Sequence, residues 1–279
     1  MSMENDFSGV RVIITRTVVL SSLVFLLWRL YSGIMPHQLA APAIFKLDYD
    51  FSFWTLKLAG IPDLITGNKT AGIVFSILLF LTGILSFRFP TKRICTLSYA
   101  VLYLVYAITF NIYLCHGSNY QAGFAVILFA FAAGTDDNFS LWWRTMRYYA
   151  CFIYATCFIW KIAHGAIWDW NHGLDCMKLN LAEYLYHYPQ TFMSGIYVWF
   201  IQHPALVNIG DKLVFIAEGT FLLGFFTKKY DRLLIFSAVF IFLSIYLFAD
   251  VFFLELLIIA LPFITAQYWL KAQHLRPAT

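Results

Sequence analysis

The sequence has little charge: Asp, Glu, Lys and Arg make up only 12% of its 279 residues, against about a quarter in a soluble domain. Hydrophobic residues make up 61%, and the mean hydropathy is +0.71. One soluble core cannot bury so much apolar surface, so we predict an integral membrane protein surrounded by lipids. The net charge of +4 is small and includes no basic stripe, which excludes a nucleic acid partner.

Several catalytic motifs are also missing. The sequence has no Walker loop, no HExxH, no dinucleotide fingerprint and no G-x-S-x-G, which argues against an ATP-driven pump and several hydrolase classes. No repeated halves are visible, so a secondary transporter is a weaker alternative. No metal site is predicted, because the nearest cluster, Asp169, His172 and Asp175, lacks a recognised ligand spacing.

The five cysteines form no Cys-x-x-Cys pair, which excludes a dithiol relay. We expect them to be buried free thiols that pack as small hydrophobic side chains. They are Cys95, Cys115, Cys151, Cys157 and Cys176.

The apolar stretches predict a bundle of about eight transmembrane helices, since each span needs about 20 apolar residues. Polar interruptions place the spans at roughly 12–34, 71–87, 94–115, 120–135, 146–165, 212–227, 232–248 and 251–269. We therefore predict an all-α integral membrane protein in which residues 1–279 form a single transmembrane domain. The longer connections, 35–70 and 166–211, are rich in aromatic residues, which favours segments lying on the membrane surface.

Lysine and arginine in the short loops predict the orientation of this bundle. With both termini on the inner side, every basic short loop falls inside and the acidic turn at Asp250 falls outside. The two longer connections and the turn at His116 then face the outer side.

Charged residues within a span are candidates for function. In the fifth span the sequence repeats every three or four residues through Tyr154, Cys157 or Phe158, Lys161, His164 and Trp168, so a helix would place these residues on one face. A lysine desolvated by aromatic rings loses its proton more readily, and the neutral amine is a competent base. The alternative is that Lys161 extends to the outer headgroups and His164 is an interface residue.

Two further candidates come from other spans. His116 lies at a turn that the topology places on the same outer side as Lys161, although it could simply be a polar turn residue. Glu218 lies inside the sixth span, where a carboxyl group must be protonated, paired or turned to a wet cavity.

Four segments together resemble the HTTM-type transmembrane domain of vitamin K-dependent gamma-carboxylases, over most of the chain. They are the string CFIWKIAHGAIWDWNHG, the turn YLCHGSNYQAGFAVILFAF, Glu218 followed by FLLGFFTKKYDR, and the closing segment LFADVFFLELLIIALPF. The large soluble domain that holds peptide substrates in the carboxylases does not follow the last span here. The resemblance is therefore to the bacterial type, which consists of the membrane domain alone.

This resemblance implies a function and a location. The family lysine is the base that starts oxygenation of a reduced quinone, with help from a histidine, and these roles would fall to Lys161 and His116. Side chains around the quinone, of the vitamin K or menaquinol type, would be His164, Trp168, Tyr154 and Glu218. The alternative is a non-catalytic quinone- or lipid-binding protein, or an accessory protein in maturation of an exported peptide, as in the sporulation-delaying protein B type. We expect the bacterial inner membrane rather than the endoplasmic reticulum.

Overall fold

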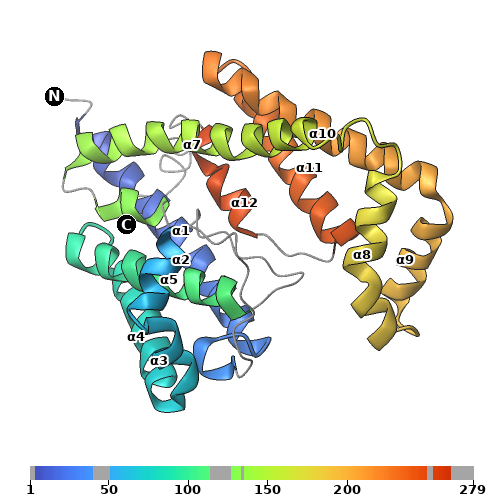
Figure 1. The fold of residues 1–279 in the computed structure, drawn as a ribbon. Helices are drawn as coiled ribbons and strands as arrows, with labels where there is room; N and C mark the ends of the chain where they lie inside the picture. Colours follow the sequence, from blue (N-terminus) through green and yellow to red (C-terminus); the bar gives the residue numbers. More distant parts are fainter. Residues whose placement is uncertain (1–3, 40–50, 114–126, 133–134, 250–253, 265–279) are drawn as a thin grey trace. The chain divides into compact units, whose positions relative to one another are not determined.

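The computed structural model describes residues 4–39, 51–113, 127–132, 135–249 and 254–264. Every regular element in these ranges is helical, so the all-α prediction is confirmed for them. The chain divides into two compact units, and Figure 1 draws their helices in the colours of the sequence. In the described part, the N-terminal unit ends at Arg144 and the C-terminal unit covers residues 145–264.

The N-terminal unit is built around α4 and the helices that contact it. Its elements are α1 (Glu4–Tyr31), the 3-10 turn η1 (Pro36–Gln38), α2 (Phe51–Leu58), α3 (Ile61–Gly67), α4 (Lys69–Arg88), α5 (Arg93–Tyr113) and η2 (Ala130–Ala132). A Cβ at Gly83 of α4 would lie 2.6 Å from Leu23 of α1 and 2.9 Å from Tyr99 of α5. Glycine therefore allows three helices to meet closely there, and the Tyr99 hydroxyl is 2.7 Å from that of Ser22 on α1.

A buried arginine in this unit is surrounded by aromatic rings. Arg29, in the last turn of α1, is only 1% exposed. Its guanidinium carbon lies 3.9 Å from the ring centroid of Phe110 and 4.5 Å from that of Phe25. Cation–π attraction of this kind offsets part of the cost of removing the charge from water.

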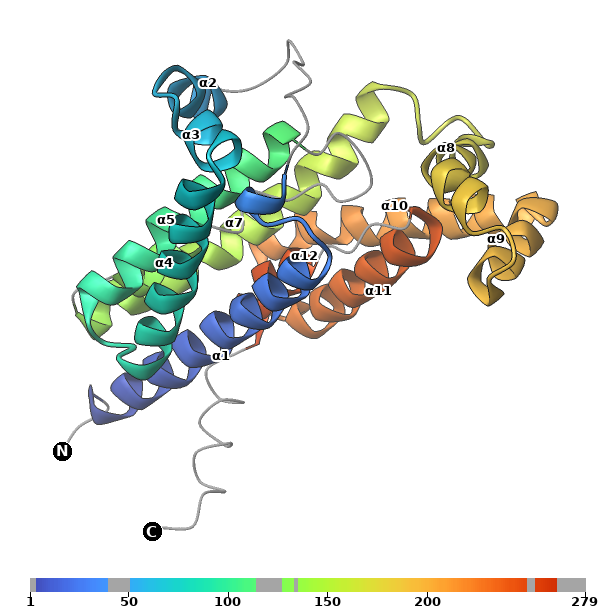
Figure 2. The same ribbon diagram turned by 90° about the horizontal axis from the view of Figure 1, so that it is seen from below.

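The C-terminal unit is arranged around α10. The helix α7 (Asp136–Ala163) begins in the N-terminal unit and continues into this one, followed by α8 (His172–His187), α9 (Phe192–Gln202), α10 (Pro204–Phe226), α11 (Asp231–Ala249), α12 (Leu254–Ile259) and η3 (Leu261–Phe263). Within this unit α8, α9 and α11 all contact α10, and Figure 2 shows α10 and α11 side by side.

Two glycines of α10 face α7. A Cβ at Gly219 would lie 3.2 Å from the ring of Phe158, and one at Gly224 would meet Sγ of Cys151. Small residues at these positions allow the two helices to approach closely, as they do in many membrane helix pairs. This packing fixes the register of α7 on α10. The register in turn decides which polar side chains of the two helices lie opposite each other.

Among the residues that the structure describes, four helical segments are long and apolar enough to cross a membrane, at Gly9–Gln38, Lys69–Arg88, Arg93–Phe110 and Asp231–Phe248. They coincide with the first, second, third and seventh predicted spans. The fifth and sixth spans correspond to α7 and α10, which are helical over 28 and 23 residues but carry several charges. Of the fourth predicted span the structure describes only residues 127–132 and 135. Of the eighth it describes 254–264, where α12 has six residues and is followed by the turn η3, so this part is not one continuous spanning helix.

Candidate functional site

Lys161 and Glu218 form an ion pair within the C-terminal unit. Lys161 lies in the last turn of α7, and its Nζ donates a hydrogen bond to Oε1 of Glu218 on α10 at 2.6 Å. The Glu218 side chain is 5% exposed and the Lys161 side chain 22% exposed. Nζ of Lys161 also lies 4.8 Å from the ring centroid of Phe215, which precedes Glu218 by one turn on α10. The fold thus brings together two charged residues that the sequence analysis predicted as separate candidates in different spans.

The second carboxylate oxygen of Glu218 has no hydrogen-bond donor among the residues that the structure describes. Oε2 is fully buried, and no described residue donates to it. An unpaired buried acceptor costs about 1–3 kcal/mol, so such atoms in native structures require an explanation. A proton on the carboxyl group, or a ligand that donates a hydrogen bond to it, would each satisfy this oxygen.

Aromatic rings lie next to this pair. Tyr154, one of the predicted site residues, is 2% exposed on α7. Its ring stacks on that of Phe221 of α10, with centroids 4.1 Å apart and an interplanar angle of 17°. Phe158 lies between Tyr154 and Lys161 along α7 and packs against Gly219. The polar pair is therefore bordered by flat apolar surfaces.

The predicted common face of α7 ends at Lys161. The amide of Ala166 donates to the Lys161 carbonyl at 2.9 Å and that of Gly165 to the Ile162 carbonyl at 3.0 Å. Gly165 has φ +76°, so these bonds form a Schellman C-cap, which requires a left-handed residue. The helix stops at Ala163 because of this glycine, and the chain then leaves the helical path.

Since α7 ends at Ala163, His164 and Trp168 lie beyond it, against the expectation that they continue the helical face of Tyr154 and Lys161. The His164 ring stacks on Trp160, with centroids 4.1 Å apart, and its Nδ1 lies 2.9 Å from the Trp160 carbonyl oxygen. Trp168 is 80% exposed in the connection to α8. His116, the remaining predicted residue, lies outside the described residues.

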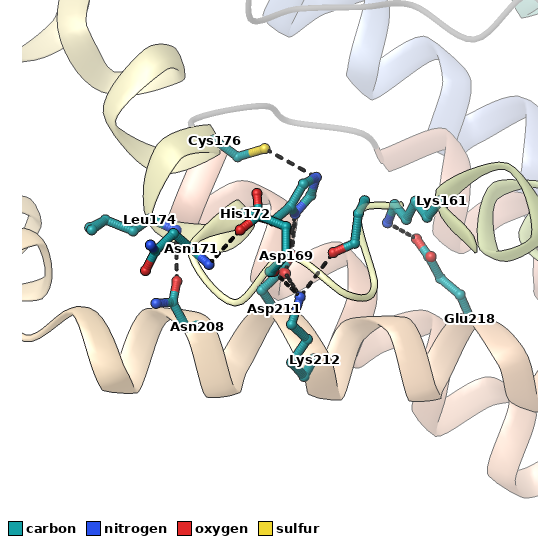
Figure 3. A network of polar contacts seen from close by, with 11 residues as sticks. Lys161, Asp169, Asn171, His172, Leu174, Cys176, Asn208, Asp211, Lys212 and Glu218 are labelled. Atoms are coloured by element: carbon teal, nitrogen blue, oxygen red, sulfur yellow. Dashed lines mark hydrogen bonds and ion pairs between the residues drawn. The ribbon is translucent and has the colours of Figure 1, made fainter. Parts of the chain in front are cut away.

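A second polar cluster joins α8 to α10 (Figure 3). Nδ1 of His172 lies 3.2 Å from both carboxylate oxygens of Asp211. Beside it, Nζ of Lys212 donates to the carbonyls of Ala166 and Asp169 at 3.0 and 2.6 Å. Lys212 thereby ties the α7–α8 connection to α10 and holds the start of α8 in place.

The amino end of α8 is capped from a different helix. Its N-cap residue, Asn171, makes no side-chain cap bond. Instead, the amide of Leu174 donates to Oδ1 of Asn208 on α10 at 3.0 Å. Because the first amides of a helix have no partner within it, this bond fixes α8 over α10. His172 is thereby placed beside Asp211.

Gly173 sets the distance between α8 and α10, and its replacement by alanine should destabilise the protein. A Cβ at Gly173 would lie 2.6 Å from Cβ of Asp211 and 3.1 Å from the Val207 carbonyl oxygen. We expect Gly173→Ala to lower the free energy of unfolding by about 1–3 kcal/mol, the usual cost of overpacking. Denaturant titration in detergent micelles measures this loss.

The matched control is Gly195→Ala in α9, where an added Cβ meets no atom within 4 Å. Alanine forms helices better than glycine by about 1 kcal/mol, so this variant should be unchanged or slightly more stable. Equal stability of the two variants would contradict the close packing of α8 on α10.

The cysteines differ from the expectation of buried thiols. Of the four that lie in the described part, Cys151 is buried and Cys95 partly so, but Cys157 and Cys176 are exposed. The expectation is therefore wrong for those two. It failed because a cysteine in a membrane protein can lie on an outward helix face at little cost, being only weakly polar.

Within the described ranges, no group of three His, Cys, Asp or Glu side chains converges in a way that could hold a metal ion. His172, which the sequence placed in a weak acidic cluster with Asp169 and Asp175, instead pairs with Asp211.

No protein-family model, no curated protein and no solved structure matches this chain. A functional assignment therefore depends on the residues and their geometry.

Proposed function

We propose that this chain is a multi-pass protein of the bacterial inner membrane that binds a reduced quinone and removes a proton from it with Lys161. In this proposal the bundle has about eight spans, both termini lie inside, and the site opens to the outer side. Four long apolar helices support the membrane assignment. The sequence resemblance to the HTTM-type domain supports the choice of ligand.

The observation that carries the proposal is the Lys161–Glu218 pair with its unpaired oxygen. When the carboxyl group takes the proton from the ammonium group, Lys161 becomes a neutral amine and can accept a proton from a ligand hydroxyl. Glu218 is the closest acceptor for the lysine proton, at 2.6 Å from Nζ. The pair can therefore store and return one proton without exposing a lone charge to an apolar environment.

The residues present fit a quinol. Oε2 of Glu218 needs a hydrogen-bond donor, and a phenolic hydroxyl is one. Phe215, and Tyr154 stacked on Phe221, offer apolar ring faces to an aromatic ligand. A reduced quinone would supply an ionisable hydroxyl and two electrons for molecular oxygen. Glu218 would orient this hydroxyl through Oε2, and the hydroxyl proton would reach Lys161 through the carboxyl group, which takes it at Oε2 and returns the lysine proton from Oε1.

The test is an epoxide assay on the purified full chain in lipid nanodiscs. Reduced vitamin K or menaquinol, oxygen, bicarbonate and a glutamate-containing peptide are supplied, and products are identified by mass spectrometry. We expect quinone epoxide in amounts that exceed the protein-free reaction. Carboxylated peptide would extend the activity to that of the carboxylases.

Two other outcomes are informative. A quinol that binds with a measurable dissociation constant but yields no epoxide would overturn the catalytic proposal and favour a quinone-binding or accessory protein, for example one that helps an exported peptide mature. Absence of both binding and turnover, from protein that elutes as a folded species, would reject the quinol site altogether.

A further inference from the structure

Cys176, His172 and Asp211 form a chain of polar contacts that the proposed quinol chemistry does not use. Sγ of Cys176 lies 3.6 Å from Nε2 of His172, one helical turn earlier on α8. The other ring nitrogen, Nδ1, lies 3.2 Å from both carboxylate oxygens of Asp211 on α10. Figure 3 shows the imidazole ring between the thiol and the carboxylate.

This order of contacts determines the direction of proton transfer. A carboxylate can only accept hydrogen bonds, so Nδ1 of His172 carries the proton that faces Asp211. Nε2 is then the acceptor nitrogen, and it faces the thiol. A nucleophile, a base within reach of it and a carboxylate that orients the base make up the general arrangement of nucleophilic catalysis.

We propose that Cys176 is a nucleophile that takes an acyl group from an ester or thioester of a fatty acid, with His172 as its base and Asp211 as a positioning residue. The step balances without an added oxidant. The Sγ–carbon bond forms as the thiol proton passes to Nε2 of His172. The bond from the acyl carbon to the leaving oxygen or sulfur breaks, and His172 returns the proton to that atom.

Exposed apolar side chains on α8 and in the connection before it indicate an acyl donor with a long chain. Leu179 follows Cys176 by three residues on α8, so it lies on the same side of the helix, and it is 78% exposed. Trp168 and Trp170, in the connection before α8, are 80% and 54% exposed. Apolar groups left in the open in this way mark contacts with lipid or with an apolar ligand.

Partial burial, together with nearby carboxylates, raises the pKa of the Cys176 thiol. Partial burial and then the Asp211 carboxylate raise the pKa of Cys176; Lys161 lowers it, and Asp175 and Asp169 raise it. Cys176 therefore depends on a base at neutral pH, unlike cysteines that exist as thiolates beside cationic groups. His172 is the base within reach.

The experiment uses the full chain in nanodiscs with p-nitrophenyl decanoate, an activated fatty acyl ester. Release of p-nitrophenol is followed in the first turnover, and the acylated residue is located by peptide mass spectrometry. We expect one decanoyl group on Cys176, lost in Cys176→Ala. In His172→Gln the acylation rate should fall by about 100-fold or more, the usual contribution of a general base.

The matched control is His187→Gln, which changes the histidine in the last turn of the same helix and should leave the rate unchanged. Acylation spread over other residues would overturn the proposal, as would a rate at Cys176 that is equal in His172→Gln and the unmodified protein. If a variant does not fold, the site of acylation in the unmodified protein still decides the identity of the nucleophile.

Asp211→Asn separates positioning from a simple charge effect. Removing the carboxylate removes a cause that raises the thiol pKa, so alkylation of Cys176 by iodoacetamide should begin at a lower pH. Acylation by the ester should nevertheless become slower, because the amide no longer orients His172. A rise in both rates would show that Asp211 acts only through its charge, and Asp175→Asn serves as the control for that effect.

Discussion

Under the function proposed above, replacing Lys161 by arginine should reduce quinol oxygenation by about 100- to 10,000-fold, the range that a general base contributes. Arginine keeps the positive charge and can still donate to Glu218, so the buried carboxylate retains its partner. The guanidinium group does not lose its proton in proteins, and it therefore cannot act as a base. The measurement is the initial rate of epoxide formation in nanodiscs.

Two further variants test whether the loss of activity comes from the lost base. Lys178→Arg, at an exposed lysine on α8, is the matched control and should keep the full rate. Glu218→Gln should also lose activity, because the amide cannot accept the lysine proton. A Lys161→Arg protein with the full rate would show that Lys161 contributes charge and not proton transfer, and the assignment of the base would be withdrawn.

The second large effect concerns stability and involves Arg147. This residue of α7 is 4% exposed, and its Nη2 lies 2.6 Å from Oδ1 of Asp231 at the start of α11. Its guanidinium also donates to the carbonyls of Gly224 and Thr227 at the end of α10, at 2.5 and 2.8 Å. One side chain thus links three helices and satisfies carbonyls that α10 leaves unpaired at its end.

We expect Arg147→Met to lower the free energy of unfolding by about 3–5 kcal/mol, because it leaves the Asp231 carboxylate buried without its cation. Unfolding in mixed micelles, followed by circular dichroism, measures the loss. The exposed Arg144, one turn earlier on α7, provides the control. Arg144→Met should change stability by less than about 1 kcal/mol, as expected for a surface charge.

A double variant tests the cause of this loss. Arg147→Met combined with Asp231→Asn removes both charges, so it should be more stable than Arg147→Met alone. If the double variant lost as much as the sum of the two single variants, the Arg147–Asp231 interaction would not be the source of the stability.

Local signals in the sequence accounted for much of the helical structure. Asn68 precedes α4 and its side chain accepts from the amide of Ala71, as an N-cap residue does. The polar interruptions also separated the apolar helices at nearly the correct residues, since α4 ends at Arg88 and α11 begins at Asp231. The predicted end of the fifth span at residue 165 is close to the end of α7 at Ala163, but the placement of Trp168 on the same helical face is wrong, because Gly165 is a recognised stop signal.

Local sequence signals predicted only some of the residues in the candidate sites. Lys161 and Glu218 each stood out as a charge in an apolar helix. The spacing of His172 and Cys176, four positions apart, places them one helical turn from each other and is a signal that the sequence does contain. Asp211, which follows His172 by 39 residues, has no local signal that could link it to that histidine.

The sequence by itself determined that this protein is helical, apolar and suited to a membrane, because hydrophobicity and helix signals act within a few residues. Tertiary structure decided which polar groups meet. Lys161 reaches Glu218 across 57 positions of the chain, and Arg147 reaches Asp231 across 84. Such pairings depend on the register of packed helices, which the glycines of α10 set by allowing close approach. A charged group in an apolar interior is stable only beside its partner, so the packing that joins these residues also creates the sites.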